Sequence, residues 1–372
     1  MVELVVGGVL PVIAEDLEIS VSKAGQLITV FAFVFALSGP ILLALTANVE
    51  RKKLFLWTLL TFFLGNMLAF ISPNFALLMV SRVFCAMSAA LITVLSLTVV
   101  TKIVTKEYLA RSLGLVFMGV SGSVVLGVPL GVLLTDAWGW RAPFLLIACL
   151  TLVSMSIIYL FLEPIRPDKG IPLSKQLAAL RDDKLISAHL VTLLFLAGHF
   201  VLYAYFTPFL QVMLNLDALW ISMVYFVYGA SAVSGGGFGG WLADKWGVNK
   251  SILFIVASFA LLLFLLPLST VNLPLFLLAM MIWGMFSWAL SPVQQSYLVQ
   301  SAPESAGIQQ SFNTTALHLG IALGSAIGSL VVTHYPLSYN AWFGALLVVG
   351  ALGCAVFSLS RPIRREVVEN RW

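Results

Sequence analysis

Apolar runs divide this sequence, and most of them are about as long as a membrane is thick. The runs fall at about 1–14, 24–47, 54–72, 75–100, 112–135, 142–162, 187–209, 220–243, 251–270, 274–298, 307–333 and 341–360. A helix of about 20 apolar residues crosses the hydrocarbon core of a bilayer, whereas strands of a membrane β-barrel would alternate apolar and polar residues. Only 10% of the residues are charged, against about 25% in soluble domains. The sequence therefore predicts an all-α membrane protein with twelve transmembrane helices.

Several features recur at an offset of 197 residues. A polar turn at 240–250, GWLADKWGVNK, corresponds to the first polar loop around 47–53. A ladder of small residues recurs in the same way, with Gly119, Ser123, Gly127 and Gly131 matching Ala316, Gly320, Gly324 and Gly328. Such a repeat is typical of transporters built from two parallel halves. We therefore predict an N-terminal six-helix bundle at 1–162, a cytoplasmic linker at 163–186 that includes a short surface helix, a C-terminal six-helix bundle at 187–360 and a cytoplasmic tail at 361–372.

Basic residues predict the orientation. All but three of the 20 Lys and Arg residues lie in the tail or in loops on one side of the predicted spans. Lys23 and Arg141 lie on the opposite side, and Arg82 lies inside the fourth run. Because Lys and Arg concentrate in cytoplasmic loops, we expect the linker and the C-terminus to lie in the cytoplasm.

The first run is short for a span. Residues 1–14 would reach about 21 Å as a helix, against a hydrocarbon core of about 30 Å. No basic segment precedes the run and no small-residue cleavage site follows it, so we do not interpret it as a signal peptide. We interpret it as the second part of a truncated helix and expect the native start to lie upstream of residue 1.

Four motifs resemble those of the major facilitator superfamily. The turn at 240–250 resembles its cytoplasmic-loop motif, and LLMVSR at 77–82 resembles its helix-4 arginine motif. The segment at 3–17 is similar to helix 1 of the twelve-span drug:proton antiporters, and LGVPLG at 126–131 is similar to their helix-5 motif. The resemblance implies two pseudo-symmetric six-helix bundles about a central cleft. It also assigns four residues to the antiporter motif, namely Gly119, Gly127, Pro129 and Gly131.

Within that branch, four stretches look most similar to bacterial purine base and nucleoside efflux pumps. They are GQLITVFAF at 25–33, GHFVLYAYFTPFL at 198–210, SPVQQSYL at 291–298 and IQQSFNTTALHLGIALGSAIG at 308–328. The resemblance implies a monomer in the bacterial plasma membrane that exports purine bases or nucleosides in exchange for protons, without a cofactor. A broader drug or sugar exporter of the same superfamily is the alternative.

An integral membrane enzyme is a further alternative from a different class. The sequence offers no metal-ligand cluster, no nucleophile beside a base and no phosphate-binding loop, which argues against it. The cysteines Cys85, Cys149 and Cys354 lie inside apolar runs without metal-ligand spacing. We interpret them as packing residues and expect no metal site.

The chain departs from the family pattern in its first cytoplasmic loop. Ala47 stands where the pattern has Asp, and Glu50 stands where it has Gly. We therefore expect the cytoplasmic gate to depend on Asp244 in the second loop. The neighbouring basic residues assigned to this gate are Lys245, Arg51 and Lys52.

Glu3 and Arg82 are the candidates for proton coupling. Glu3 lies about 18 Å from the outer end of the first run, near the middle of the membrane. An ionisable residue at that depth is costly and indicates function; the alternative is the exposed end of a frayed helix. Arg82 lies within about 7 Å of the same depth. It could pair with the Glu3 carboxylate, or it could bond backbone carbonyl groups of the first span.

Aromatic and amide side chains gather in three runs of the second half. They are His199, Tyr203, Phe206, Trp283, Trp288, Gln309, Gln310, Asn313 and His318. A planar heterocycle is bound by aromatic stacking and by groups that pair with its ring edge, so we predict that these residues line the substrate site. Packing against neighbouring helices, or hydrogen bonding across them, is the alternative for each one.

Overall fold

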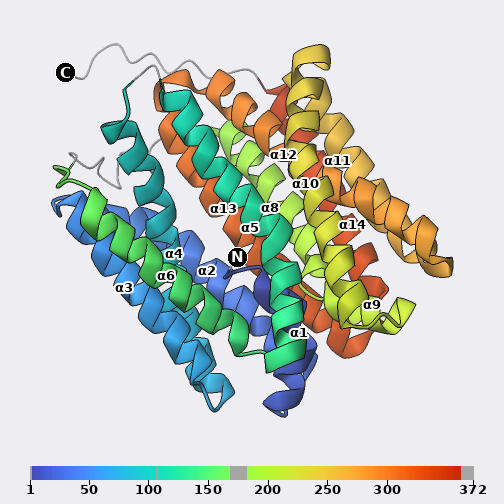
Figure 1. Ribbon diagram of the computed structural model, residues 1–372. Helices are drawn as coiled ribbons and strands as arrows, with labels where there is room; N and C mark the ends of the chain where they lie inside the picture. The colour runs from blue at the N-terminus through green and yellow to red at the C-terminus, as the bar shows by residue number, and fades with distance from the viewer. Residues whose placement is uncertain (1, 106–107, 168–181, 362–372) are drawn as a thin grey trace.

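The computed structural model describes residues 2–105, 108–167 and 182–361 (Figure 1). The first half of the chain forms α1 (Val5–Asp16), α2 (Val21–Leu45), α3 (Arg51–Phe70), α4 (Phe75–Ile103), α5 (Leu109–Trp138) and α6 (Ala142–Phe161). The second half forms α8 (Asp183–Tyr203), α9 (Phe206–Leu214), α10 (Ala218–Trp246), α11 (Val248–Leu265), α12 (Leu273–Ser301), α13 (Ala306–His334) and α14 (Tyr339–Ser360). Two 3₁₀ turns, η1 (Leu266–Val271) and η2 (Pro303–Ser305), adjoin α11 and α13.

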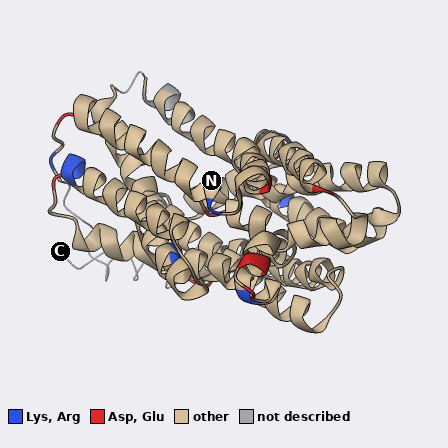
Figure 2. Cartoon of the chain, turned by 60° about the horizontal axis from the view of Figure 1, so that its bottom comes forward, with Lys and Arg blue, Asp and Glu red and all other residues tan. Residues whose placement is uncertain are grey.

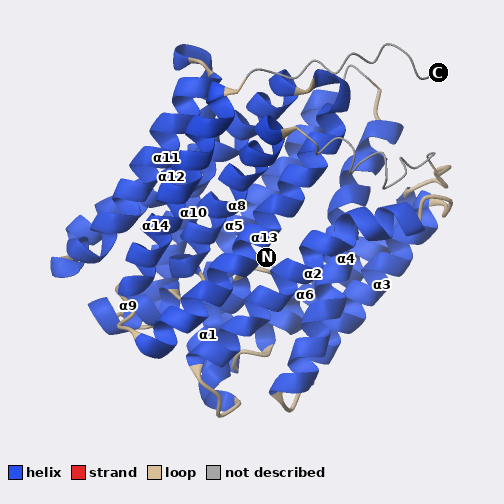
Figure 3. Ribbon diagram, turned by 180° about the vertical axis from the view of Figure 1, so that it is seen from behind, coloured by secondary structure: helices blue, strands red, loops and turns tan. Residues whose placement is uncertain are grey.

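The predicted all-α architecture is confirmed for the described residues, which contain helices and no strand (Figure 3). Eleven described helical segments are long and apolar enough to cross a membrane, and α1, with 12 residues, is not among them. Most of the ribbon carries no charge, and charged residues gather mainly near helix ends and loops (Figure 2). The helix predicted inside the linker and the tail beyond residue 361 lie outside the described residues. The α8 helix begins at Asp183, within the segment predicted as linker.

Helix starts follow the polar residues that separate the apolar runs. Ser20, Asn74, Asp217 and Asn272 each accept a hydrogen bond from a backbone N–H in the first turn of the helix that follows. These side chains satisfy amide groups that have no partner within the helix. Gly247 separates α10 from α11 with a positive φ of 81°, a conformation that side chains other than glycine rarely adopt. The polar turn predicted at 240–250 is thus the junction between two spanning helices.

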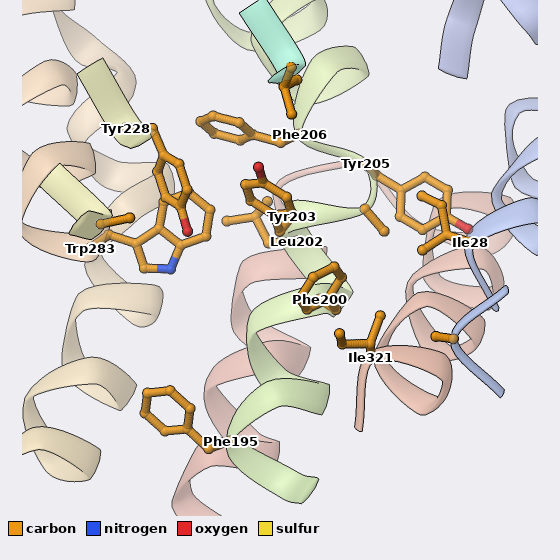
Figure 4. Packing of buried hydrophobic residues seen from close by; sticks show 14 of the residues in the cluster. Ile28, Phe195, Phe200, Leu202, Tyr203, Tyr205, Phe206, Tyr228, Trp283 and Ile321 are labelled. Atoms are coloured by element: carbon orange, nitrogen blue, oxygen red, sulfur yellow. The ribbon is translucent and has the colours of Figure 1, made fainter. Parts of the chain in front are cut away.

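The structure divides the predicted seventh helix into two. The run at 187–209 was expected to form one span, but α8 ends at Tyr203 and α9 starts at Phe206. Pro208 provides the physical reason, because its ring would clash with the carbonyl group of Ala204 in a continuous helix. The two side chains at the break diverge. Tyr203 points toward Tyr228 and Trp283, whereas Tyr205 points the other way, toward α2 (Figure 4).

The small residues of α13 let it pack directly on the backbone of α8. A Cβ on Gly324 would meet the backbone of Ala197, and Gly320 and Gly328 face α8 carbonyl groups one turn to either side. Close approach of this kind is how small residues serve helix pairs in membranes. The predicted ladder of the second half is therefore a packing face.

The equivalent ladder in α5 is in contact only over its later turns. Gly131 faces the side chain of Val5 in α1, while Gly127 and Pro129 are buried. A Cβ on Gly119 would meet nothing within 4 Å. Proline inside α5 also removes one backbone hydrogen bond of the helix.

Most of the hydrogen bonds between the two halves lie toward one end of the molecule, among the residues that the structure describes; the bond from the Thr315 hydroxyl to the Ala36 carbonyl, at 3.4 Å, lies farther along α2 and α13. The Ser22 hydroxyl lies 2.7 Å from that of Ser329, and the Ser325 hydroxyl donates to the Gly25 carbonyl. The Ser222 hydroxyl of α10 donates to the Pro129 carbonyl of α5. These contacts are near the loops that precede α2 and α10. The opposite end carries the junctions α2–α3 and α10–α11 (Figure 1).

Candidate transport site

Glu3 lies just before α1, and this end of the helix is near the middle of the molecule (Figures 1 and 3). Its Oε2 atom is 3.8 Å from Nε2 of His318 on α13. Its other carboxylate oxygen is buried without a hydrogen-bond partner. The Glu3 side chain is 19% exposed and that of His318 is 11% exposed. Because α1 and α13 belong to different halves, this pair of titratable groups bridges them.

The His318 ring is held on two sides. Its Nδ1 atom is 3.0 Å from the carbonyl oxygen of Thr314, one turn earlier in α13. Its face stacks on Phe35 of α2, with ring centroids 3.8 Å apart and planes 16° apart. These two contacts direct Nε2 toward Glu3. The imidazole is therefore fixed in position by α2 and α13 together.

Arg82 is fully buried on α4, and two nitrogen atoms of its guanidinium group donate hydrogen bonds to backbone carbonyl groups. Nη1 donates to the Val2 carbonyl at 2.9 Å, and Nε donates to the Leu27 carbonyl at 3.4 Å. The guanidinium lies 4.2 Å from the ring centroid of Phe31. The structure thus brings Arg82 to the start of α1, where it holds the backbone next to Glu3, and Nη2 remains without a partner.

Four of the predicted substrate residues form one aromatic cluster inside the second half. His199, Tyr203, Phe206 and Trp283 are all buried, and the His199 ring centroid is 5.0 Å from that of Trp283. Figure 4 shows Tyr203, Phe206 and Trp283 around a common centre. Nδ1 of His199 and Nε1 of Trp283 are buried without hydrogen-bond partners. The cluster therefore holds two polar atoms that a bound molecule could satisfy.

Tyr228 joins this cluster and was not predicted from the sequence. Its hydroxyl lies 3.2 Å from Nε2 of His199 and 3.0 Å from the hydroxyl of Ser287. Tyr225, one turn earlier in α10, packs edge-on against Phe206. The two tyrosines at i, i+3 spacing in the run 220–243 were the available signal, because this spacing places them on one helix face.

The other predicted substrate residues lie elsewhere. The Gln309 side-chain oxygen is 2.9 Å from Nε2 of His189, and the Thr192 hydroxyl donates to Asn313 at 2.6 Å. Both contacts join α13 to α8. Gln310 is exposed, and Trp288 is partly buried at the edge of the core. The nine predicted residues thus fall into an aromatic cluster, a polar seam between α8 and α13, the separate His318 position and two peripheral positions.

The predicted gate residues of the second loop lie at the end of α10. Asp244 is exposed, and Lys245 is exposed with its Nζ atom 4.9 Å from the Trp241 ring centroid. Most of the hydrogen bonds between the halves are at the other end of the molecule, near Ser22 and Ser222. The role of Asp244 in a cytoplasmic gate stays a prediction.

In the first loop, Arg51 is buried and its guanidinium donates to the Thr46 and Ala47 carbonyl groups. Lys52 lies over the ring of Tyr159, 5.7 Å from its centroid. Arg51 thus braces the junction of α2 and α3, whereas Lys52 packs against α6.

Two grooves on the outer surface are separate from these residues. One of about 600 Å³ lies between α3 and α6 and is lined by apolar side chains together with Lys53. The other, of about 360 Å³, lies between α11 and α14. Neither is lined by a residue predicted for coupling or substrate binding.

A bundle of apolar spanning helices with ionisable and aromatic residues at its centre is the arrangement of a membrane transporter. The Major Facilitator Superfamily profile matches residues 1–325, and the chain belongs to this superfamily. It is accordingly a multi-pass membrane transporter and not an enzyme.

Similar proteins support this placement. The chain is 35% identical over 350 residues to the uncharacterized MFS-type transporter YbcL of Bacillus subtilis (strain 168), covering 94% of this chain and 90% of YbcL. It is 30% identical over 350 residues to a probable sugar efflux transporter of Pasteurella multocida (strain Pm70), covering 91% of this chain and 84% of the relative.

Among solved structures, a bacterial homolog of the human lysosomal transporter Spinster, in an inward-facing and occupied conformation, is similar with a TM-score of 0.76. The match covers 96% of this chain and 93% of that chain at 16% identity. The likeness shows that the fold is shared.

Proposed function

We propose that this transporter exports small neutral molecules, and purine bases or nucleosides in particular, across the bacterial plasma membrane in exchange for protons. The observation that carries the proposal is the position of Glu3, a carboxylic acid between the two halves, beside a histidine and near a buried arginine. A carboxyl group at the centre of a spanning bundle is costly to bury, and such residues generally mark proton or ion pathways.

The arrangement of the halves supports alternating access. Hydrogen bonds such as that between Ser325 and Gly25 close one end of the molecule. With the orientation predicted from the basic loops, this is the outer end, and the central residues would face the cytoplasm. Export would then require the contacts at the outer end to separate while the end that carries Asp244 closes.

The aromatic cluster supports a planar substrate. The rings of His199, Tyr203 and Trp283 are buried against one another, with His199 stacked on Tyr203, so a planar substrate would have to enter this stack. The unpaired nitrogen atoms of His199 and Trp283 would then offer one position each for the edge of a heterocycle. Stacking with an aromatic side chain contributes about 1–3 kcal/mol per base. A purine combines a large stacking surface with several edge groups, and it fits this set better than a compact aliphatic molecule.

Sugar export is the second candidate. The observation that favours it is the likeness to the probable sugar efflux transporter of Pasteurella multocida. Hydroxyl groups of a sugar could also satisfy the unpaired nitrogen atoms, but a sugar offers no flat face to the aromatic rings.

Reconstituted vesicles test the proposal. Purified protein in liposomes with an acidic lumen should accumulate labelled adenine or inosine when the outside is made alkaline. Glu3→Gln should keep exchange of labelled for unlabelled substrate, since the amide is similar in size, and should lose accumulation driven by the pH gradient. Accumulation of a monosaccharide but not of purines would favour the second candidate. Purine transport that ignores the pH gradient in the unaltered protein would refute proton exchange.

A further inference from the structure

We propose that Glu3 and His318 act as a single unit that holds either one proton or a hydrogen-bond donor of the substrate, and that this competition couples the two fluxes. This inference rests on the proposed proton exchange and assigns the second half of the chain a direct part in it. The unit consists of one acceptor from each half, Oε2 of Glu3 and Nε2 of His318, which are 3.8 Å apart.

The tautomer of His318 follows from its contact with Thr314. A backbone carbonyl oxygen can only accept a hydrogen bond, so the Nδ1 atom 3.0 Å away must carry hydrogen. In the neutral ring the other nitrogen, Nε2, then has a lone pair and no hydrogen. That lone pair is directed at the carboxyl group of Glu3.

The singly protonated pair has two tautomeric forms, and both are compatible with close contact. With one proton present, the pair is either a carboxylic acid donating to neutral imidazole or a carboxylate beside imidazolium. In both forms a single proton lies between Oε2 and Nε2, and the attraction draws α1 and α13 together. A modest approach of the two atoms converts their 3.8 Å separation into a hydrogen bond of roughly 2.8 Å.

Loss of that proton leaves two acceptors facing each other. A carboxylate and an imidazole lone pair repel, and neither can satisfy the other. Because Oε2 of Glu3 and Nε2 of His318 are 3.8 Å apart, one donor nitrogen can lie between them at a hydrogen-bond distance of roughly 2.9 Å from both. A ring N–H or an amino group of a neutral heterocycle is such a donor. An anionic substrate would face the carboxylate and be excluded. The proton and the substrate donor therefore compete for the same place.

Among the other titratable groups, Arg82 lies next to the pair, and the rest lie at helix ends or contact other residues. Arg82 on α4 donates to the Val2 carbonyl beside Glu3. The other titratable groups on α1, α13 and the helices packed against them are at helix ends, in the aromatic cluster or in contacts of their own; they include Glu15, Asp16, Lys23, Asp136, Asp183, Lys184, His189, His199, Tyr203, Tyr205, Tyr297, His334, Tyr339 and Cys354. The pair is thus the position where a proton can be exchanged between the halves.

The test uses the full-length protein in liposomes and the single variants Glu3→Gln and His318→Gln. Each variant should lose accumulation of labelled adenine driven by a pH gradient while exchange of labelled for unlabelled adenine continues. The double variant should lose no more than either single variant, because both substitutions disable one unit. His334→Gln is the matched control, since His334 is an exposed histidine at the end of the same helix.

A second readout does not require transport. In detergent, adenine affinity of the unaltered protein should fall about tenfold per pH unit on the acidic side of the transition, which corresponds to one competing proton. The affinity of each single variant should be flat over the same range. His318→Phe keeps a flat ring against Phe35 and provides the same measurement if His318→Gln is unstable.

Two outcomes separate this inference from the proposed function. If Glu3→Gln loses coupling while His318→Gln and His318→Phe keep it, proton exchange stands and the two-residue unit is overturned. If the unaltered protein shows no response to the pH gradient, the proposed function itself fails. A steep pH dependence that persists in the His318 variants would likewise overturn the unit.

Discussion

Glu50 is the last residue of the first polar loop, and its carboxylate accepts hydrogen bonds from three backbone N–H groups. Two belong to Lys52 and Lys53 at the start of α3, at 2.7 and 3.1 Å, and the third is that of Ile165 after α6, at 2.9 Å. Burial acts to raise the pKa of Glu50 and is the largest single influence, but the three N–H donors together hold the pKa below its ordinary value. Glu50, which departs from the family pattern, thus caps α3 and also binds the segment that follows α6.

Replacing Glu50 should destabilise the protein in a pH-dependent manner. Because the folded-state pKa lies below the ordinary value of 4.5, the stabilising effect of the carboxylate is present above that value and is lost as pH falls through the folded-state pKa. We expect Glu50→Ala to lower the free energy of unfolding by about 1 kcal/mol at neutral pH, the typical cost of losing a helix cap. Thermal unfolding in detergent at several pH values measures this difference. Glu163→Ala, which removes an exposed acidic residue nearby, is the control, and an equal loss in both variants would contradict the role of Glu50.

At the scale of helices, the contact between α8 and α13 depends on the absence of side chains. A Cβ on Gly324 would lie too close to the backbone of Ala197, so Gly324→Ala should force the helices apart and lower stability by about 1–3 kcal/mol. Gly353→Ala in α14 is the matched control, because a Cβ there meets nothing within 4 Å. Alanine in that exposed helical position should leave stability unchanged or raise it by up to ~1 kcal/mol. Unfolding temperatures of the two variants in detergent give the comparison, and equal shifts would show that the packing is looser than the structure indicates.

Helices were the part of the fold that the sequence predicted best, because length and hydrophobicity decide whether a segment spans a membrane. The break before Phe206 was within reach only in part, since Pro208 disfavours a continuous helix at that point, but α2, α5 and α12 each continue through a proline. The division of the predicted substrate residues was not. Gln309 and Asn313 looked like Gln310 in the sequence, and only the packing of α13 on α8 shows that the first two bond that helix while the third is exposed. Periodicity gives the face of a helix but not the neighbour that covers it.

For the whole molecule, the placement of one half against the other determines the candidate site. Glu3 was singled out from its depth alone, with Arg82 as the expected partner. The structure adds His318, from the far end of the chain, at 3.8 Å. This contact could not be predicted from the sequence, because it depends on which turns of α1 and α13 meet after both halves have folded. The backbone contacts of Arg82 were one of two alternatives that the sequence left open.

Transport by alternating access requires the contacts between the halves near Ser22 to separate. The hydroxyl oxygen atoms of Ser22 and Ser329 are 2.7 Å apart, close enough for two cysteine sulfur atoms at these positions to reach a bond of about 2.05 Å. With Cys85, Cys149 and Cys354 replaced by alanine, we expect oxidised Ser22→Cys/Ser329→Cys protein to bind substrate from the open end but not to transport it. Reduction should restore transport. Each single cysteine variant, treated with the same oxidant, controls for damage elsewhere. Transport at the unaltered rate by fully cross-linked protein would show that this end stays closed throughout the cycle and that the substrate takes another path.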